Sequence, residues 1–171
     1  MSDQVGADTA QFAPEYDAPL EYMRRTREYY LALGYDNPYR WAHYTDAPFT
    51  PLRKPLKDST LALISTAAPY QPDKGDQGPG ALYNAAAKFY TVYSGDSAAD
   101  HDTRISHIGY DRKHTTAKDS NTWFPLPLMR KFAAEGRFKL AKRFHGAPTN
   151  RSQRVTLETD APEILARCRQ D

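Results

Sequence analysis

The stretch TLALISTAA, residues 60–68, is the main indication of the fold. It is a short continuous apolar run that ends in small hydroxyl residues, which is typical of a strand buried on both faces of a sheet. Ser65 and Thr66 fall at its carboxyl end. Because ligands of open α/β sheets bind just outside the carboxyl ends of the strands, we expect these two side chains to bind substrate. The alternative is a polar strand exit that bonds its own turn.

Further strands and helices are predicted on the carboxyl side of this run. FYTVYS (89–94), RISHIG (104–109) and FKLAKRFHGA (138–147) are predicted strands. A helix is expected from about Leu126 to Glu135, with prolines at its start and Gly136 after its end. TDAPEILARCRQD (159–171) predicts a closing helix, with Asp160 and Glu163 in a capping-box pattern. The fold class is therefore α/β: a small, mostly parallel sheet flanked by helices, with an open edge that we expect a partner chain to complete.

The N-terminal third is predicted to contain a polar tail, one helix and an extended arm, without a strand. Residues 1–17 are expected to form a mobile polar tail, and residues 18–171 a single α/β domain. Within that domain, 18–57 should hold a helix and an extended arm, and 58–171 the body. The helix is expected to be capped by Asp17 and stopped by Gly34. Closely spaced prolines forbid helix in residues 36–56, so we expect an extended arm laid over the body and anchored by aromatic side chains such as Phe49.

Composition excludes several classes of protein. Cys168 is the single cysteine of the 171 residues, which excludes an internal disulfide, a CxxC redox pair and a cysteine-based zinc cluster. There is no apolar run of the ~20 residues that span a bilayer and no signal-peptide pattern, so a cytoplasmic location is expected. The net charge is +2, but residues 129–154 are strongly basic. That stretch is predicted to be a solvated face or to meet an acidic partner or an anionic substrate, without a nucleic-acid partner.

The stretch RISHIGYDRKH, residues 104–114, concentrates polar groups after a predicted strand. One interpretation gives His107 and Asp111 an acid–base role, because histidine titrates near neutrality. A second makes His107, Asp111 and His114 ligands of a metal, provided that the chain turns at Gly109. A third is structural: Arg104 pairs with Asp111, while the histidines are buried or solvated. The residues predicted to bind substrate are Ser65, Thr66, Arg104 and Tyr110.

Several separated blocks resemble one enzyme family. The blocks are YRWAHYTDAPFTPLRKPLKDSTLALISTAA (39–68), RISHIGYDRKHTTAKDSNTWFPLPLMRKFAAEG (104–136) and TDAPEILARCRQD. They resemble, in the same order, the N-terminal half of the selenoprotein B family. That family includes component B of glycine, sarcosine and betaine reductases and the related subunit of D-proline reductase.

The resemblance implies a subunit that is not active alone. In the family, a second α/β half holds the cysteine or selenocysteine that carries out reductive cleavage of a bond at carbon, and Cys168 does not match that residue. We therefore expect a half-enzyme that supplies fold and part of the substrate pocket, paired with itself or with a chain that carries the redox half. The alternatives are a non-catalytic homo-oligomeric binding or assembly protein, and a metal-dependent enzyme using His107, Asp111 and His114. No cofactor motif is recognisable, so the cofactor stays undefined.

Overall fold

The computed structural model describes residues 21–35, 45–47, 49–107, 109–149 and 151–171. The chain divides into two compact units, Met1–Ala47 and Pro48–Asp171. In the first unit, helix α1 (Tyr22–Ala32) has no buried residue, and it ends before Gly34, whose φ of 86° is a left-handed conformation. The predicted cap Asp17 and residues 36–44 of the predicted arm lie outside the described residues. The second unit, called the body here, carries the sheet.

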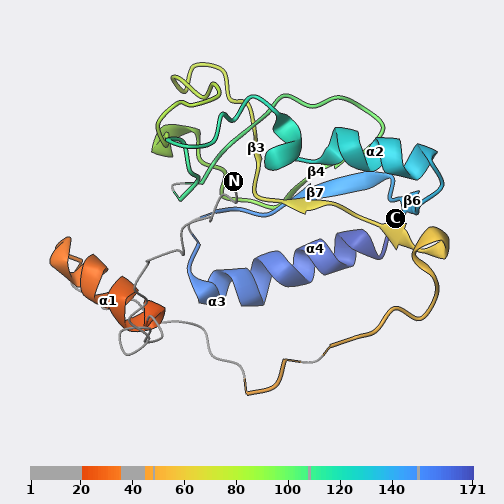
Figure 1. Cartoon of the computed structure of the whole chain (residues 1–171), viewed down its shortest axis with the longest axis horizontal. Helices are drawn as coiled ribbons and strands as arrows, with labels where there is room; N and C mark the ends of the chain where they lie inside the picture. Colours follow the sequence, from red (N-terminus) through yellow and green to blue (C-terminus); the bar gives the residue numbers. More distant parts are fainter. Residues whose placement is uncertain (1–20, 36–44, 48, 108, 150) are drawn as a thin grey trace, which may run out of the picture. The chain divides into compact units, whose positions relative to one another are not determined.

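The body is an α/β fold, as predicted. The run TLALIS forms β1 (Thr60–Leu61) and β2 (Ile64–Ser65), which are parallel to β6 (Lys139–Leu140) and β7 (Arg143–Gly146), respectively. Strand β4 (Tyr93–Asp96) lies antiparallel on the other side of β7, which gives the order β2–β7–β4 (Figure 1). Strand β7 is therefore the central strand of this sheet.

A bulge interrupts the parallel pair. Thr60 is opposite Lys139, but Ile64 is opposite His145, so the β6–β7 strand has two extra residues between the paired positions. Backbone bonding nevertheless continues on both sides: Ala141 N donates to Leu61 O (2.8 Å). The bulge explains why one apolar run in the sequence is divided into two short strands in the structure.

A second, smaller sheet follows the first. Strand β3 (Ala68–Pro69) pairs antiparallel with β5 (Thr103–Arg104). The predicted strand RISHIG is thus wrong beyond its first residue, because β5 ends at Arg104. Three short 3₁₀ helices complete the connections: η2 (Leu56–Asp58), η3 (Ala85–Ala87) and η4 (Ser120–Thr122).

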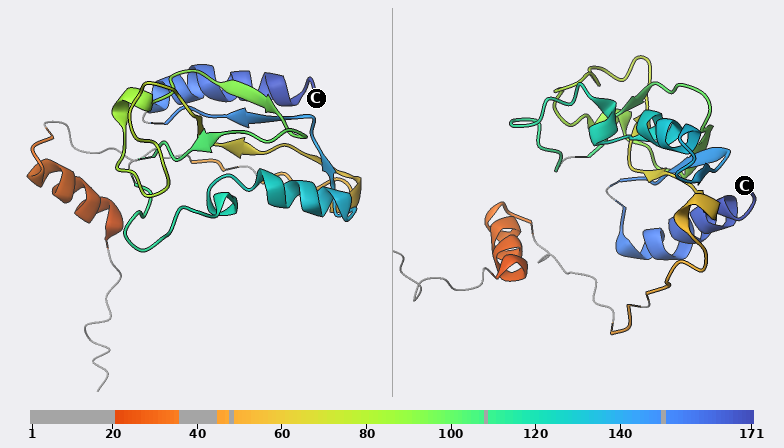
Figure 2. Two further views of the ribbon diagram at one scale, coloured as in Figure 1. Left: turned by 90° about the horizontal axis from the view of Figure 1, so that it is seen from above. Right: turned by 45° about the vertical axis from the view of Figure 1, so that its right-hand side comes forward.

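Helices cover both faces of the sheet. Helix α2 (Leu126–Ala134) lies on one side and α4 (Ala161–Cys168) on the other (Figures 1 and 2). The bounds of α2 agree with the prediction, with Pro125 as its N-cap and Gly136 after its end at φ 76°. None of the described helices combines the length and the apolar character needed to cross a membrane.

The closing helix begins earlier than predicted. It starts at α3 (Gln153–Val155), where the Ser152 hydroxyl accepts a hydrogen bond from Val155 N (3.3 Å), and continues through a π-helical turn η5 (Thr156–Asp160) into α4. Asp160 has helical dihedral angles (φ −68°, ψ −44°), so the predicted capping box is wrong. The wider π turn lies just before Pro162, whose ring would clash with the carbonyl four residues back in a regular helix. The helix therefore passes through the proline instead of starting at it.

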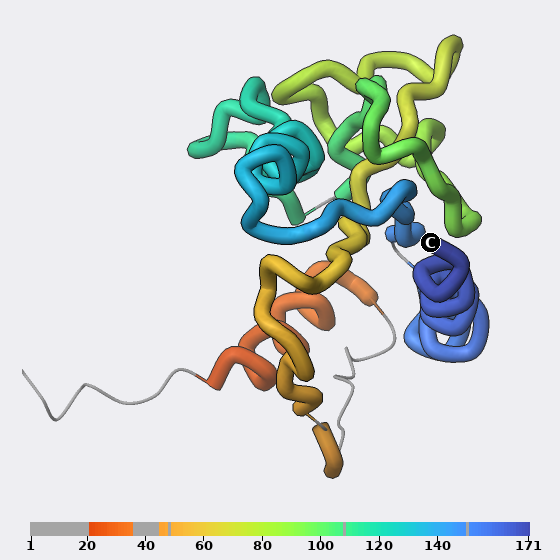
Figure 3. Tube along the Cα trace, turned by 90° about the vertical axis from the view of Figure 1, so that its right-hand side faces the viewer, coloured from red at the N-terminus to blue at the C-terminus, as the bar shows by residue number. Residues whose placement is uncertain are grey.

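The core lies between the sheet and α2. Phe144 and Leu126 are each 1 % exposed and form a cluster with Phe124 and Ala67. The Phe124 and Phe144 rings meet edge to face, with their centroids 5.0 Å apart. By contrast, residues 49–58 are exposed and lead into β1 (Figure 3), and Phe49 is 89 % exposed. The expectation that Phe49 anchors an arm on the body is wrong.

Candidate functional site

The carboxyl ends of the neighbouring strands β2 and β7 lie side by side. This end of the sheet is called the carboxyl edge here. Ala147 N donates to Ser65 O (2.8 Å), which aligns the two strand exits. The Ser65 side chain is buried, and its Oγ accepts a hydrogen bond from Ala67 N (3.0 Å). The Thr66 side chain is exposed at the same edge. The Ser65 hydroxyl therefore stabilises its own turn, while Thr66 is open to a ligand.

A residue that the sequence did not single out joins this edge to the 104–114 segment. Thr149 Oγ1 donates to the backbone oxygen of Ser106 (2.6 Å), and both residues are buried. Thr149 lies three residues after the end of β7, so its place after a predicted strand was the available signal. The bond holds the chain next to His107 beside the residues that follow β7.

The polar side chains after Ser106 mostly bond their own turns. Exposed His107 accepts a hydrogen bond on Nδ1 from Gly109 N (3.0 Å). Asp111 accepts one on Oδ1 from His114 N (3.0 Å), and its Oδ2 lies 3.1 Å from His114 Nδ1. The hydrogen bond from the His114 backbone lowers the pKa of Asp111, so this carboxyl is ionised at neutral pH. His107 and Asp111 thus lie in successive turns, each held locally.

The predicted metal ligands are only partly brought together. Asp111 contacts His114, whereas the His107 ring is turned towards Gly109. Among the described residues, no three His, Cys, Asp or Glu side chains are grouped so that they could hold a metal ion.

Arg104 occupies the end of β5 and contacts groups on several sides. Its guanidinium carbon lies 4.8 Å from the centre of the Tyr70 ring, a cation–π contact. Its Nη1 donates to Thr103 O (3.0 Å) and forms an ion pair with Asp102. The structural alternative that paired Arg104 with Asp111 is therefore wrong. Its Nε is buried and has no hydrogen-bond partner among the described residues.

Two cavities of the body meet at Arg104. The smaller one, about 20 Å³, is bordered by Ser106 and Arg112 and has room for one water molecule. The larger one, about 320 Å³, lies between the turn that precedes β5 and the start of α2. Its volume is within the range of small-molecule sites. Its other charged or aromatic lining residues are Asp100, His101, Asp102, Trp123, Phe124 and Arg130.

The larger cavity presents both signs of charge. Arg130 Nη2 donates to Asp100 Oδ1 (2.5 Å), and this hydrogen bond lowers the pKa of Asp100. The Asp102–Arg104 pair lines the same cavity. His101 is held by a contact between its Nε2 and Asp96 O (2.6 Å). Two carboxylates and two guanidinium groups in one small cavity suit a ligand that carries both a carboxylate and an ammonium group.

Arg112 and Tyr110 fix the loop beside the smaller cavity. Arg112 Nε donates to Ala81 O (2.6 Å), and its Nη1 donates to His107 O (2.9 Å). The Tyr110 hydroxyl is 3.4 Å from Thr122 Oγ1. Among the described residues, no carboxylate lies within ion-pair distance of Arg112, whose guanidinium donates to backbone oxygens and lies over the Tyr110 ring.

A separate polar network lies between β7 and α4. Arg167 Nη1 donates to Ser94 Oγ (2.7 Å), and Ser94 Oγ is 2.8 Å from His145 Nδ1. Because Ser94 accepts from Arg167, its own proton is directed to Nδ1, which leaves the Nε2–H of His145 facing Asp171 Oδ2 at 3.5 Å. Asp171 also accepts from Arg143 Nε (2.7 Å). His145 is fully buried, and this burial lowers its pKa despite the nearby Asp171 carboxylate.

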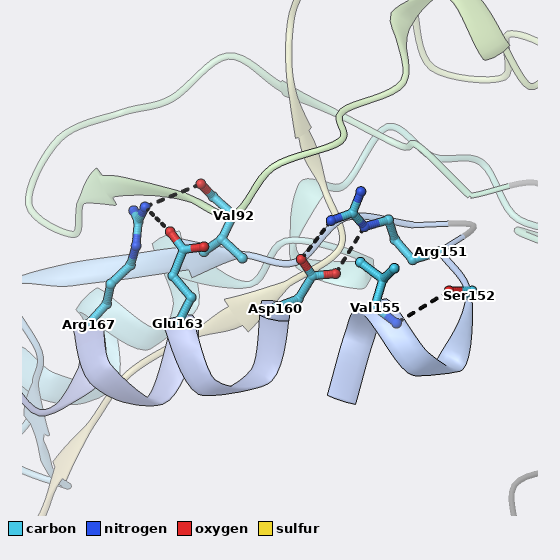
Figure 4. Close-up of polar contacts among 7 residues, drawn as sticks. All are labelled: Val92, Arg151, Ser152, Val155, Asp160, Glu163 and Arg167. Carbon is cyan, nitrogen blue, oxygen red and sulfur yellow. Dashed lines mark hydrogen bonds and ion pairs between the residues drawn. The ribbon is translucent and has the colours of Figure 1, made fainter. Parts of the chain in front are cut away.

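Arginine side chains bind the middle and the C-terminal part of the closing helix (Figure 4). Arg151 donates through Nε and Nη2 to the two carboxylate oxygens of Asp160 (3.1 and 2.9 Å), and Asp160 is 3 % exposed. These bonds raise the pKa of Arg151. Arg167 Nη2 donates to Glu163 Oε1 (2.5 Å) and to Val92 O (3.4 Å).

Five arginines of the predicted basic stretch form ion pairs with carboxylates of the same chain. The pairs with Glu135 and Glu158 are exposed, so these arginines remain accessible to solvent. The five pairs are Arg130–Asp100, Arg137–Glu135, Arg143–Asp171, Arg151–Asp160 and Arg154–Glu158.

Half of the chain is similar in sequence to a known enzyme subunit. Over 92 residues, 53 % of this chain, it is 38 % identical to the D-proline reductase subunit gamma of Acetoanaerobium sticklandii. The match covers 35 % of that protein, so the chain spans about a third of its relative's length. No protein-family profile matches the sequence. No solved structure matches it either. The similarity supports a relationship between this chain and the D-proline reductase family.

Proposed function

We propose that this chain is part of a heteromeric, thiol- or selenol-dependent reductase and supplies part of the substrate pocket. The observation that carries the proposal is the 38 % identity to a D-proline reductase subunit. Two features of the body support it: strand exits gathered at one edge of the sheet, and a cavity of about 320 Å³ lined by paired charges beside Arg104.

The proposed reaction requires a redox partner outside this chain's own residues. In reductive cleavage, a bond at carbon breaks, and the carbon and its former neighbour each gain a hydrogen. The two electrons come from a thiol pair or a thiol–selenol pair, which is oxidised to a disulfide or a selenenyl sulfide. Cys168 is the single cysteine in the sequence and is half-buried at the end of α4, so it has no second cysteine with which to form such a pair. The nucleophile would come from a partner chain.

The body's own residues would bind and orient a small charged substrate. In this proposal Arg104 and Arg130 hold a substrate carboxylate, while Asp100 and Asp102 attract an ammonium group. On binding, each of these side chains would replace part of its contact with its present ion-pair partner by a contact with the ligand.

The residues of the carboxyl edge would complete the proposed site. Thr66 is exposed there, Arg112 carries a positive charge on the loop, and Tyr110 is held beside it by Thr122. Exposed His107 would transfer a proton to or from the substrate, and Asp111 would hold the turn at residues 111–114 in place. The metal alternative would require the His107 ring to turn away from Gly109 and towards Asp111 and His114.

The test is turnover in the assembled protein. The full-length protein, purified with its copurifying chains, should reduce D-proline at the expense of a dithiol, with L-proline as the stereochemical control. Arg104→Gln removes the charge at the cavity and should raise KM by about 10-fold or more. Arg137→Gln is the matched control, because Arg137 is an exposed arginine that contacts Glu135 and the Phe132 ring and does not line the cavity.

Two results would count against the proposal. One is a purified assembly that contains no thiol- or selenol-bearing partner and turns over no proline. The other is an Arg104→Gln assembly whose KM equals that of Arg137→Gln. The second result would move the pocket away from Arg104 while leaving the reductase assignment in place.

A further inference from the structure

The outer edge of β1 and β2 is unpaired among the described residues. Strand β2 is terminal in the order β2–β7–β4, and β1 pairs only with β6. Backbone donors of the β6–β7 strand reach every second carbonyl of this run. The bonds are Lys139 N to Ser59 O, Ala141 N to Leu61 O, His145 N to Leu63 O and Ala147 N to Ser65 O. Because backbone groups alternate in direction along a strand, those of Thr60, Ala62 and Ile64 face the open side.

This edge lacks the features that normally protect an edge strand. Residues 59–68 contain no charged side chain and no proline. Natural edge strands are usually guarded by one or the other, because an unguarded edge pairs with other chains. Ile64 is nevertheless 53 % exposed, and Thr60 is exposed too. A strand with the composition of an interior strand thus lies at the margin of the sheet.

We infer that a second copy of this chain covers the edge. The two β1–β2 edges would lie antiparallel about a two-fold axis, with Ala62 opposite the partner copy's Ala62. In this register the N–H and C=O groups of Thr60 form hydrogen bonds with those of Ile64 in the partner copy. The same groups of Ile64 bond those of Thr60 in the partner copy. The two sheets would then form one continuous sheet across the axis.

The edge is complementary to itself in this register. The two-fold axis passes between the two Ala62 residues, so a charged side chain at this position would meet the same charge in the partner copy. The uncharged run avoids that repulsion. Thr60 and Ile64 are both β-branched, and β-branched cross-strand pairs stabilise antiparallel sheets. The small Ala62 side chains leave room at the axis.

The expected association is weak and does not depend on the proposed enzymatic function. Two short strands bury less than the roughly 1,200–2,000 Å² of a standard interface, so a dissociation constant on the order of 10 µM is expected. No residue of the cavity beside Arg104 takes part in the edge. The two proposals can therefore fail separately.

A disulfide cross-link tests the register. In a Cys168→Ala background, Ala62→Cys should give a covalent dimer on mild oxidation. Directly opposed residues of a hydrogen-bonded antiparallel pair have Cα atoms about 5.5 Å apart, which a disulfide can span. The control is Ala86→Cys in the same background, because Ala86 is exposed in η3 and far from the edge in sequence. It should remain monomeric in denaturing gels.

A charge at the edge tests the energetics. Ile64→Lys should weaken the dimer by about 10-fold, because it removes both cross-strand Ile64–Thr60 pairs and places on each edge strand the lysine by which natural edge strands prevent pairing. The fold should persist in near-UV circular dichroism, since about half of the Ile64 side chain is already exposed. Leu82→Lys, at a position 87 % exposed in a loop, is the matched control.

Sedimentation equilibrium of the full chain up to a few hundred micromolar decides the outcome. A dimer that Ile64→Lys dissociates and Ala62→Cys traps supports the inference. A monomer throughout that range overturns it. So does a dimer that is insensitive to Ile64→Lys and gives no cross-link at 62, or an edge found occupied by a strand of a different chain.

Discussion

Residues 104–114 and strand β7 carry similar polar side chains but use them in opposite ways. In 104–114, exposed His107 and Asp111 bond backbone groups two or three residues away. In β7, His145 is fully buried and takes part in a network that reaches residues far along the chain, Ser94 and Asp171. The sequence drew attention to the first region for chemistry and to the second only as a strand. Position in the sheet, not residue type, makes the difference.

The cause lies in the neighbours of each segment. Strand β7 is central, with β2 and β4 on either side and helices on both faces, so any polar side chain there must find a partner inside the protein. The 104–114 segment leaves the short strand β5 after Arg104 and turns on the surface. Side chains in surface turns bond locally or meet solvent, and they remain available to a ligand. We therefore expect the β7 region to act as a scaffold and the region around Arg104 to bind a ligand.

The largest effect is expected in the scaffold. Phe144→Ala removes a side chain that is 1 % exposed and packs edge to face against Phe124, so it should cost about 3–5 kcal/mol of the free energy of unfolding. Urea unfolding followed by circular dichroism would measure it. A loss below about 1 kcal/mol would mean that β7 is not the centre of the core.

The polar network should matter next. Ser94→Ala removes the hydroxyl that bonds both Nδ1 of buried His145 and the guanidinium of Arg167. This change should lower the free energy of unfolding by about 1–3 kcal/mol. The same unfolding assay applies, with Ser120→Ala as a control at a half-buried serine of η4. Equal midpoints for the two variants would show that the network adds nothing to stability.

The pH dependence of stability should sharpen the contrast. Burial lowers the pKa of His145 in the folded protein below the usual value of about 6.5 that it has when unfolded. Between the lowered pKa and about pH 6.5, the unfolded chain binds more protons at His145 than the folded protein does. The stability that neutral His145 contributes is therefore present above about pH 6.5 and is lost as the pH falls through the lowered pKa. Asp171 opposes the shift and Arg143 and Arg167 reinforce it. Unfolding midpoints measured across this range should fall less steeply in His145→Gln; identical slopes would remove His145 as the cause.

The smallest effect on stability is expected in the exposed segment. His107→Ala removes one local hydrogen bond at an exposed position, so the free energy of unfolding should change by no more than about 0.5 kcal/mol. If His107 transfers a proton in the assembled reductase, the same variant should lower kcat and alter its pH profile. A large drop in stability would instead make His107 a structural residue.

Local patterns in the sequence were enough to predict some of these features. The apolar run of β1 and β2, the prolines and the glycine that bound α2, and the hydroxyl groups at the strand exit each depend on neighbouring residues. The α/β class follows from them.

Other features depend on contacts between distant residues. Asp160 resembles a helix cap in the sequence, but its partner Arg151 and the π turn make it a buried part of the helix. One alternative paired Arg104 with Asp111, whereas in the structure Arg104 lies over the Tyr70 ring, which the β3–β5 pairing brings near it. The cavity beside Arg104 combines a turn before β5 with the start of α2. No pattern of neighbouring residues in the sequence predicts these contacts.

The most direct test compares Arg104→Gln with Ser94→Ala in the assembled, copurified protein, measuring both the unfolding midpoint and dithiol-dependent reduction of D-proline. We expect Arg104→Gln to raise KM while the midpoint stays nearly unchanged. We expect Ser94→Ala to lower the midpoint while turnover per folded molecule is retained. Normal KM in Arg104→Gln together with lost turnover in folded Ser94→Ala would contradict these expectations, and would place the binding site in the β7–α4 region.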